Sequence, residues 1–162
     1  MKTRIAINGF GRIGRNLFRL LIDHASIEVV AINDIADNKT MAHLVKYDSI
    51  HGKLPYECSF TEDSIIINEK TYLFFHEKSI SNLDWKSLNI DFVIESTGKY
   101  QTFDDINAHI LAGAKKVILS APSDVDAIKT VVLGVNETIL DGSETIISNA
   151  SCTTNNAAPM IK

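Results

Sequence analysis

The N-terminal segment from Arg4 to Asp34 reads RIAINGFGRIGRNLFRLLIDHASIEVVAIND. It opens with a β-prone run, Arg4–Asn8, and continues through the glycine-rich turn NGFGRIG into a helical pattern. Apolar residues at helical spacing define the face that we expect this helix to bury: Ile13, Leu17, Leu20 and Leu21. A second β-prone run, Ile27–Asn33, follows. Strand, turn, helix and strand over about 30 residues predict a βαβ unit with two parallel strands.

Three glycines with the spacing GxGxxG lie between the first strand and the helix. Gly9 allows a tight turn, Gly11 lets a diphosphate approach the backbone, and Gly14 lets the helix pack closely on the strand. Asp34 ends the second strand, where its carboxylate can accept hydrogen bonds from ribose hydroxyls and repel a 2′-phosphate. We therefore expect a dinucleotide site that favours NAD over NADP, against the alternative of a glycine turn that only fits a tight corner.

The rest of the chain continues the alternation of strands and helices. Short β-prone pieces between Thr40 and Ile80, after a helical stretch to Tyr47, indicate an antiparallel insertion at the sheet edge. Further elements are expected as strands at Asp91–Glu95, Lys116–Ser120, Val131–Val135 and Thr145–Ser148 and a helix at Asp104–Ala112. This pattern predicts an α/β fold with a Rossmann-type, doubly wound, mostly parallel sheet. Residues that end two of its strands are candidate cofactor contacts: Thr97, Gly98 and Ser120.

Composition excludes several classes of protein. The 162 residues carry a net charge of −4 and are 45% hydrophobic, which is typical of a compact domain rather than a disordered chain. No apolar run approaches the about 20 residues of a membrane-spanning helix, so we expect a cytoplasmic protein without membrane contact. The slightly negative net charge indicates no basic surface that would bind nucleic acid. The sequence contains no CxxC or HxxxH spacing of the kind that indicates a metal site. We expect surface or structural roles for all five histidines.

Cys152 lies in the segment SNASCTTN, a polar corner between a strand and a helix. The start of a helix favours a thiolate, which attacks a carbonyl carbon far better than a thiol does. A single cysteine is otherwise most often a small buried apolar residue, and the position at a helix start in a dinucleotide fold decides against that alternative here. Cys58 lies in a β-prone piece, so we assign it no chemistry.

Six segments occur along the chain in the order and spacing of a known family: INGFGRIGR (Ile7–Arg15), KYDS (Lys46–Ser49), ESTG (Glu95–Gly98), AGAKKVILSAP (Ala112–Pro122), GVNE (Gly134–Glu137) and SNASCTTN (Ser148–Asn155). Over essentially the whole chain they resemble phosphorylating glyceraldehyde-3-phosphate dehydrogenase. The resemblance implies NAD-dependent oxidation of an aldehyde phosphate through a cysteine thioester that inorganic phosphate cleaves, as in glycolysis.

Site residues follow from the same resemblance. Cys152 matches the nucleophile, and Ser151 and Thr153 match positions that hold phosphate near the thioester. Together with the strand-end candidates above, the expected cofactor contacts are Gly9, Phe10, Gly11, Arg12, Ile13, Gly14, Asp34, Lys78, Thr97, Gly98 and Ser120. The family's general base is a histidine that would follow position 162.

We expect residues 1–150 to form an NAD-binding Rossmann domain and residues 151–162 to begin a catalytic domain that is otherwise missing from this chain. The chain alone is then expected to bind NAD without turnover, and the full-length protein to be a homotetramer. Two alternatives stay open: erythrose-4-phosphate dehydrogenase, a sister group that shares the NAD fingerprint, and a non-catalytic NAD-binding fragment.

Overall fold

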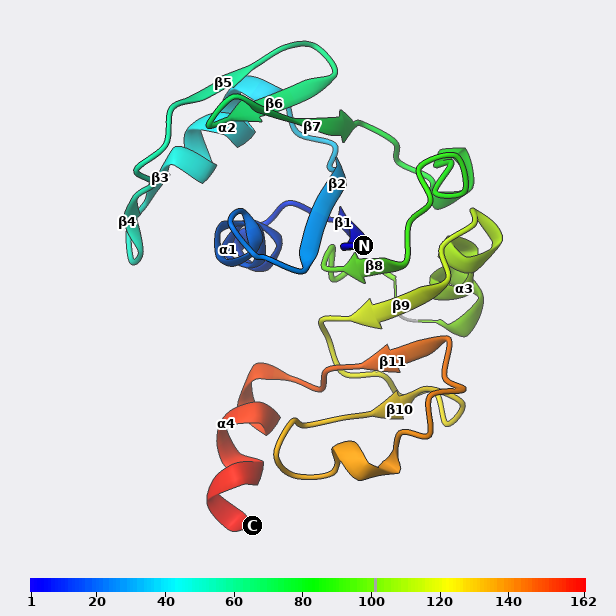
Figure 1. The fold of residues 1–162 in the computed structure, drawn as a ribbon. Coiled ribbons are helices and arrows are strands. Elements are labelled where there is room, and N and C mark those ends of the chain that lie inside the picture. Colours follow the sequence, from blue (N-terminus) through cyan, green and yellow to red (C-terminus); the bar gives the residue numbers. More distant parts are fainter. Residues whose placement is uncertain (101) are drawn as a thin grey trace.

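The computed structural model describes residues 1–100 and 102–162, and its main feature is a nine-stranded sheet with the order β10-β11-β9-β8-β1-β2-β7-β6-β5 (Figure 1). The strands are β1 (Thr3–Asn8), β2 (Ile27–Asn33), β5 (Cys58–Phe60), β6 (Ser64–Ile67), β7 (Lys70–Phe75), β8 (Phe92–Glu95), β9 (Lys116–Leu119), β10 (Lys129–Thr130) and β11 (Ile146–Ser148). A separate hairpin pairs β3 (Tyr47–Asp48) with β4 (Gly52–Lys53). The helices are α1 (Arg12–Leu21), α2 (Asn38–Lys46), α3 (Phe103–Leu111) and α4 (Cys152–Ile161), with short 3-10 helices η1 (Ile80–Asn82) and η2 (Glu137–Ile139).

The predicted βαβ unit is confirmed, and it forms the centre of the sheet. β1 pairs in parallel with β2 on one side and with β8 on the other. Because the chain leaves β1 toward β2 and later returns beside β1 as β8, the winding direction reverses between β1 and β8. Ligands of doubly wound sheets bind at the carboxyl ends of the strands at such a reversal.

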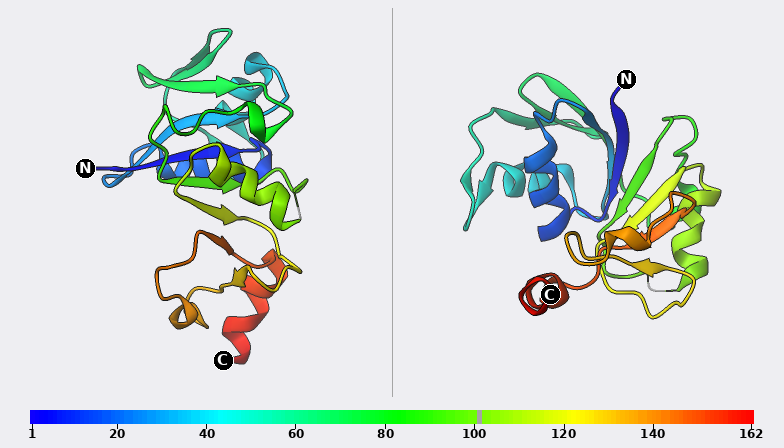
Figure 2. Two further views of the ribbon diagram at one scale, coloured as in Figure 1. Left: turned by 90° about the vertical axis from the view of Figure 1, so that its right-hand side faces the viewer. Right: turned by 60° about the horizontal axis from the view of Figure 1, so that its bottom comes forward.

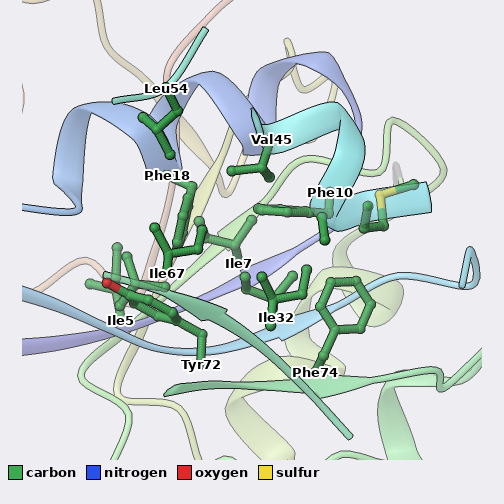
Figure 3. Close-up of a cluster of buried hydrophobic side chains, with 14 residues drawn as sticks. Ile5, Ile7, Phe10, Phe18, Ile32, Val45, Leu54, Ile67, Tyr72 and Phe74 are labelled. Carbon is green, nitrogen blue, oxygen red and sulfur yellow. The ribbon is translucent and has the colours of Figure 1, made fainter. Parts of the chain in front are cut away.

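Helices cover both faces of the sheet, and each covered face has its own core. Figure 1 shows α1 and α2 on one side and α3 on the other. Alternate residues of β1 divide between the two cores, with Ile5 and Ile7 on the α1 side and Ala6 on the α3 side. Figure 3 shows Phe18 of α1 in the first of these cores, where its ring contacts Phe10 and Tyr72 edge to face. These two layers hold the ends of the central strands in place.

The buried face of α1 differs from the expectation. Ile13 and Leu20 are 54% and 78% exposed, whereas Gly14 and Phe18 are buried. Helical periodicity depends on apolar side chains, and a glycine contributes none to it. Because Gly14 is the residue at the closest approach of helix and strand, it and not Ile13 sets which side of α1 faces the sheet.

The insertion after α2 is confirmed as antiparallel, with one refinement. β5 pairs with β6 and β6 with β7, both antiparallel, but β7 itself pairs in parallel with β2. β7 therefore extends the parallel sheet, and its carboxyl end lies beside the end of β2.

The expected strand at Val131–Val135 is wrong. The strand is the two-residue β10, Lys129–Thr130, and the chain turns after it. The side chain of Asn136 accepts a hydrogen bond from Val132 N at 2.7 Å and donates to Thr130 O at 3.0 Å. The side chain of Asn136 thus makes the hydrogen bonds that a neighbouring strand would otherwise make. Residue preferences for β-strands do not include such a side-chain contact.

A cluster of charges joins β10 to the loop before β11, and it predicts a pH dependence. The hydrogen bond from Lys129 lowers the pKa of Glu144 to about 2, and hydrogen bonds from Ser143 lower the pKa of Asp141 to about 2. Unfolded carboxyl groups titrate near pH 4, so this stabilisation is present above about pH 4 and is lost as the pH falls toward 2. Glu144→Gln should therefore lower the melting temperature at pH 7 but not at pH 2, as thermal melts followed by circular dichroism would show.

The chain ends in α4, which projects beyond β10 in Figures 1 and 2. Its last residues Met160 and Ile161 are 74% and 84% exposed. Over the described ranges, no helix combines the length and apolarity needed to cross a membrane. The same ranges hold no group of three or more His, Cys, Asp or Glu side chains placed to bind a metal ion.

Candidate functional site

The glycine turn after β1 packs against the turn after β8. Gly9 has a φ of +92°, and a Cβ at this position would lie 2.5 Å from Thr97 N, so both conformation and space require glycine. A Cβ at Gly14 would collide with the carbonyl oxygen of Gly9. A Cβ at Gly11, by contrast, would meet no atom within 4 Å. The first and third glycines therefore close the turn, and the second leaves open space in front of the backbone.

The amino end of α1 is left without a side-chain cap. Its N-cap residue is Gly11, whereas Asp37, Thr102 and Ser151 cap α2, α3 and α4 by accepting a backbone N–H. Within the described part of the chain, α1 is thus the one α-helix whose first-turn amides lack this partner. Such amides, together with the positive end of the helix dipole, favour an anion.

Asp34 lies directly beside the glycine turn. Its Oδ2 accepts a hydrogen bond from Phe10 N at 2.6 Å, and its Oδ1 accepts one from Ala36 N at 3.0 Å. These two bonds fix the carboxylate at the end of β2 and leave further acceptor positions for a ligand. The negative charge in this place disfavours a second anion there, so a ribose with free hydroxyls suits the position better than a phosphorylated one.

A cleft of about 450 Å³ opens at the carboxyl ends of the central strands. It brings together five of the expected contact residues, namely Gly9, Gly11, Asp34, Lys78 and Thr97. Sequence reasoning missed the other lining residues: Asn8, Asn33, Ile35, Glu77, Ser96, Lys99 and Tyr100. A signal in the sequence could have found Asn8 and Asn33, because each is a polar residue that ends a strand directly after a run of apolar residues.

The remaining expected contacts lie around the cleft. Phe10 is 0% exposed and its backbone is bonded to Asp34 and Arg15, while Arg12 and Ile13 are exposed at the start of α1. Gly98 has a φ of +68° and sits between two lining residues. Ser120 is half-buried and donates its backbone N–H to Glu95 O at 2.9 Å, one strand away from the cleft.

Cys152 is the first residue of α4 and is exposed. Ser151 caps the helix, with its Oγ accepting from Thr154 N at 3.0 Å. The hydroxyls of Thr153 and Thr154 lie 2.8 and 2.7 Å from the same oxygen. Ala150, just before the cap, is buried in the left-handed region with a φ of 56°. The expected helix start is confirmed, and it places an accessible thiol beside a group of hydroxyls.

The two cysteines should differ sharply in reactivity. Burial raises the pKa of Cys58, and its thiol lies 3.6 Å from Tyr56 O as a donor. At pH 7 we expect iodoacetamide to modify Cys152 at least about tenfold faster, because reaction needs an accessible thiolate. Peptide mass spectrometry of briefly alkylated protein measures both rates, with Cys152→Ser and Cys58→Ser as single-thiol controls. Equal slow rates would instead favour a non-catalytic module.

The five histidines lie at positions that agree with the surface or structural roles expected for them. His24, His43, His51 and His76 are exposed. His109 is 0% exposed and has hydrogen-bond partners on both ring nitrogens, Trp85 Nε1 on one and Glu95 Oε2 on the other. Its imidazole is therefore fully occupied within the protein.

Known proteins match this chain along its whole length. A family model described as the NAD-binding domain of glyceraldehyde 3-phosphate dehydrogenase matches residues 3–103. A glyceraldehyde-3-phosphate dehydrogenase from Thermotoga maritima is 52% identical over 162 residues, which cover 99% of this chain and 48% of that protein. Those from Geobacillus stearothermophilus and Mycoplasma pneumoniae are 47% and 49% identical, and the matches cover 100% and 98% of this chain and 48% and 47% of those proteins. The chain thus spans about half the length of the curated relatives it matches.

Proposed function

Because the chain belongs to the glyceraldehyde-3-phosphate dehydrogenase family and its cofactor is NAD, we propose that it supplies the cofactor site and the nucleophile of an enzyme that oxidises D-glyceraldehyde 3-phosphate to 1,3-bisphosphoglycerate. The observation that carries the proposal is the uncapped start of α1, which meets the open side of Gly11 and the carboxylate of Asp34 at one cleft. This arrangement fits a diphosphate joined to a ribose.

Different residues at the cleft would bind different parts of NAD. The first-turn amides of α1, from Arg12 and Ile13 onward, would bind the diphosphate over Gly11, and Asp34 would accept hydrogen bonds from the adenosine ribose. Phe10 and Gly14 hold this turn in place. Lys78, Thr97 and Gly98 would contact the cofactor from the opposite wall, and Ser120 from the strand beyond.

The proposed chemistry begins at Cys152. Its thiolate attacks the aldehyde carbon and forms a thiohemiacetal. NAD held in the cleft would supply the hydride acceptor. Once that carbon has lost its hydride and the hydroxyl group its proton, Cys152 carries a thioester. Ser151 and Thr153 would hold inorganic phosphate, whose oxygen attacks the thioester carbon. The acyl phosphate leaves and the thiolate returns.

The proton acceptor is proposed to lie outside these 162 residues, since His109 has both ring nitrogens in hydrogen bonds. We accordingly propose that the 162-residue chain binds NAD but does not turn over. The full-length protein is proposed to be a cytoplasmic homotetramer.

Absorbance of NADH at 340 nm tests the activity. The protein expressed from its complete gene should reduce NAD with glyceraldehyde 3-phosphate, and the rate should depend on added inorganic phosphate. Erythrose 4-phosphate is the competing substrate in a parallel assay. A higher kcat/KM for erythrose 4-phosphate, or a rate indifferent to phosphate, would contradict the proposed reaction.

A further inference from the structure

Buried polar side chains form a network beneath the cleft, with Glu95 at its centre. Glu95 is the last residue of β8 and is 1% exposed. Its Oε2 accepts hydrogen bonds from Asn8 Nδ2 at 2.5 Å and from His109 Nε2 at 3.0 Å. Its Oε1 accepts from the backbone N–H and the hydroxyl of Thr97 at 2.8 and 2.5 Å. Donors therefore occupy all of the roughly four acceptor positions of this carboxylate.

One end of the network fixes the state of His109. The indole N–H of Trp85 can only donate, and Trp85 Nε1 lies 3.0 Å from His109 Nδ1. His109 Nδ1 must then be the acceptor, so the proton of the neutral ring is on Nε2 and points at Glu95. Both Trp85 and His109 are 0% exposed, and water cannot replace either bond.

The other end fixes two amides. Asn8 Nδ2 donates to Glu95, so Asn8 Oδ1 is free to accept from Asn33 Nδ2 at 2.7 Å. Asn33 Oδ1 accepts from the backbone N–H of Glu77 at 2.8 Å, and Asn33 Nδ2 also donates to Glu77 O at 3.0 Å. An inverted amide at Asn8 or Asn33 would set donor against donor. The carboxylate thus determines the orientation of Asn8, and Asn33 is held between the oxygen of Asn8 and the backbone of Glu77.

The network has an inner and an outer part. The outer part lines the cleft and consists of Asn8, Asn33, Glu77 and Thr97. The inner part, which we call the buried support, does not line the cleft and consists of Glu95, His109 and Trp85. Every hydrogen bond that joins the side chain of Glu95 to residues outside the buried support ends on a cleft-lining residue, Asn8 or Thr97.

We propose that the buried support is a positioning unit for the ADP-ribose part of the cofactor. It holds the amides of Asn8 and Asn33 and the turn at Thr97 in the orientation that the ligand meets, so that binding need not reorganise them. The inference rests on the proposed placement of NAD in the cleft. A network that served the fold alone would have no reason to end there, because well-packed apolar residues stabilise a core as well as a buried charge does.

Glu95→Gln tests this with little change of volume. A glutamine that turns its oxygen toward Asn8 and His109 must set its NH₂ group against the N–H of Thr97. We expect the affinity for ADP-ribose, measured by isothermal titration calorimetry, to fall about tenfold, as for one lost buried hydrogen bond. The matched control is Lys46→Met, which removes another buried polar side chain, bonded to Tyr56 O and Glu57, at the far end of α2. Lys46→Met should lower stability and leave ADP-ribose affinity unchanged.

Unchanged affinity in Glu95→Gln, or an equal loss in Lys46→Met, would overturn the proposal. If Glu95→Gln does not fold, the wild-type chain decides. Trp85 is the single tryptophan, so its indole N–H gives one resolved NMR signal. Saturation with ADP-ribose should leave that signal in place, because a support that is already set in the free chain is not rearranged by binding; a shift that shows rearrangement of the buried Trp85 would refute the positioning role. Failure of the wild-type chain to bind ADP-ribose at all would contradict the cofactor placement itself, which keeps the two failures distinct.

Discussion

Gly14→Ala is expected to lower the free energy of unfolding by about 3 kcal/mol and to abolish measurable NAD binding. The added methyl group would collide with the carbonyl oxygen of Gly9 and lie 3.1 Å from both Ile7 Cγ2 and Ser96 Oγ. Two of these atoms belong to rigid surroundings, the backbone of the turn and the buried side chain of β1. The helix must therefore move away from β1, which displaces its first-turn amides from the cleft.

Gly11→Ala is the matched control for stability, since it adds the same methyl group three residues earlier in the same turn. The new Cβ meets no atom within 4 Å, and the φ of −69° suits any residue. Stability should change by no more than about 1 kcal/mol, the usual size of an N-cap effect. NAD affinity should still fall at least about tenfold, because the methyl group occupies the space in front of the uncapped amides. Urea denaturation and calorimetric titration separate the two quantities.

The two glycine variants together form a sharp test. An alanine at Gly14 that leaves stability intact would contradict the packing described for the turn. An alanine at Gly11 that binds NAD as well as glycine does would contradict the position assigned to the diphosphate.

Cys152→Ala is expected to lower the rate of phosphate-dependent NAD reduction by at least about a thousandfold, because no thioester can then form. NAD binding should be retained, since the cleft proposed to hold the ADP-ribose part is formed without Cys152. The protein expressed from its complete gene is the material to assay, with NADH absorbance as the readout. Cys58→Ala is the control and should retain the rate, since Cys58 is a half-buried thiol in β5. Retained activity in Cys152→Ala would show that Cys152 is not the nucleophile.

Local signals made the centre of the fold predictable. The apolar run Ile27–Asn33 is the strand β2 without a shift at either end, and β1 differs from its expected range by one residue. Continuous runs of β-branched residues between turn signals are characteristic of strands buried on both faces. The errors at Ile13 and at Val131–Val135 arose where one residue, Gly14 or Asn136, decides the local geometry through a contact that periodicity does not include.

The candidate site was predictable only where its signal is contiguous in sequence. The spacing of three site residues is typical of a βαβ turn, and the structure places all three at one cleft: Gly9, Gly11 and Asp34. Glu95 and His109 meet across the β8–α3 crossover, and Trp85 joins them from the segment before β8. No local pattern brings these three together, because their contact depends on how α3 packs on the sheet.

The placement of NAD at the start of α1 is tested most directly by an NMR titration of the isotope-labelled chain with NAD. With the diphosphate at the start of α1, the largest backbone amide shifts should fall on Gly11, Arg12 and Ile13, together with Asp34 and Thr97. Shifts confined to other parts of the chain, with the amides of Gly11–Ile13 unmoved at saturation, would contradict it.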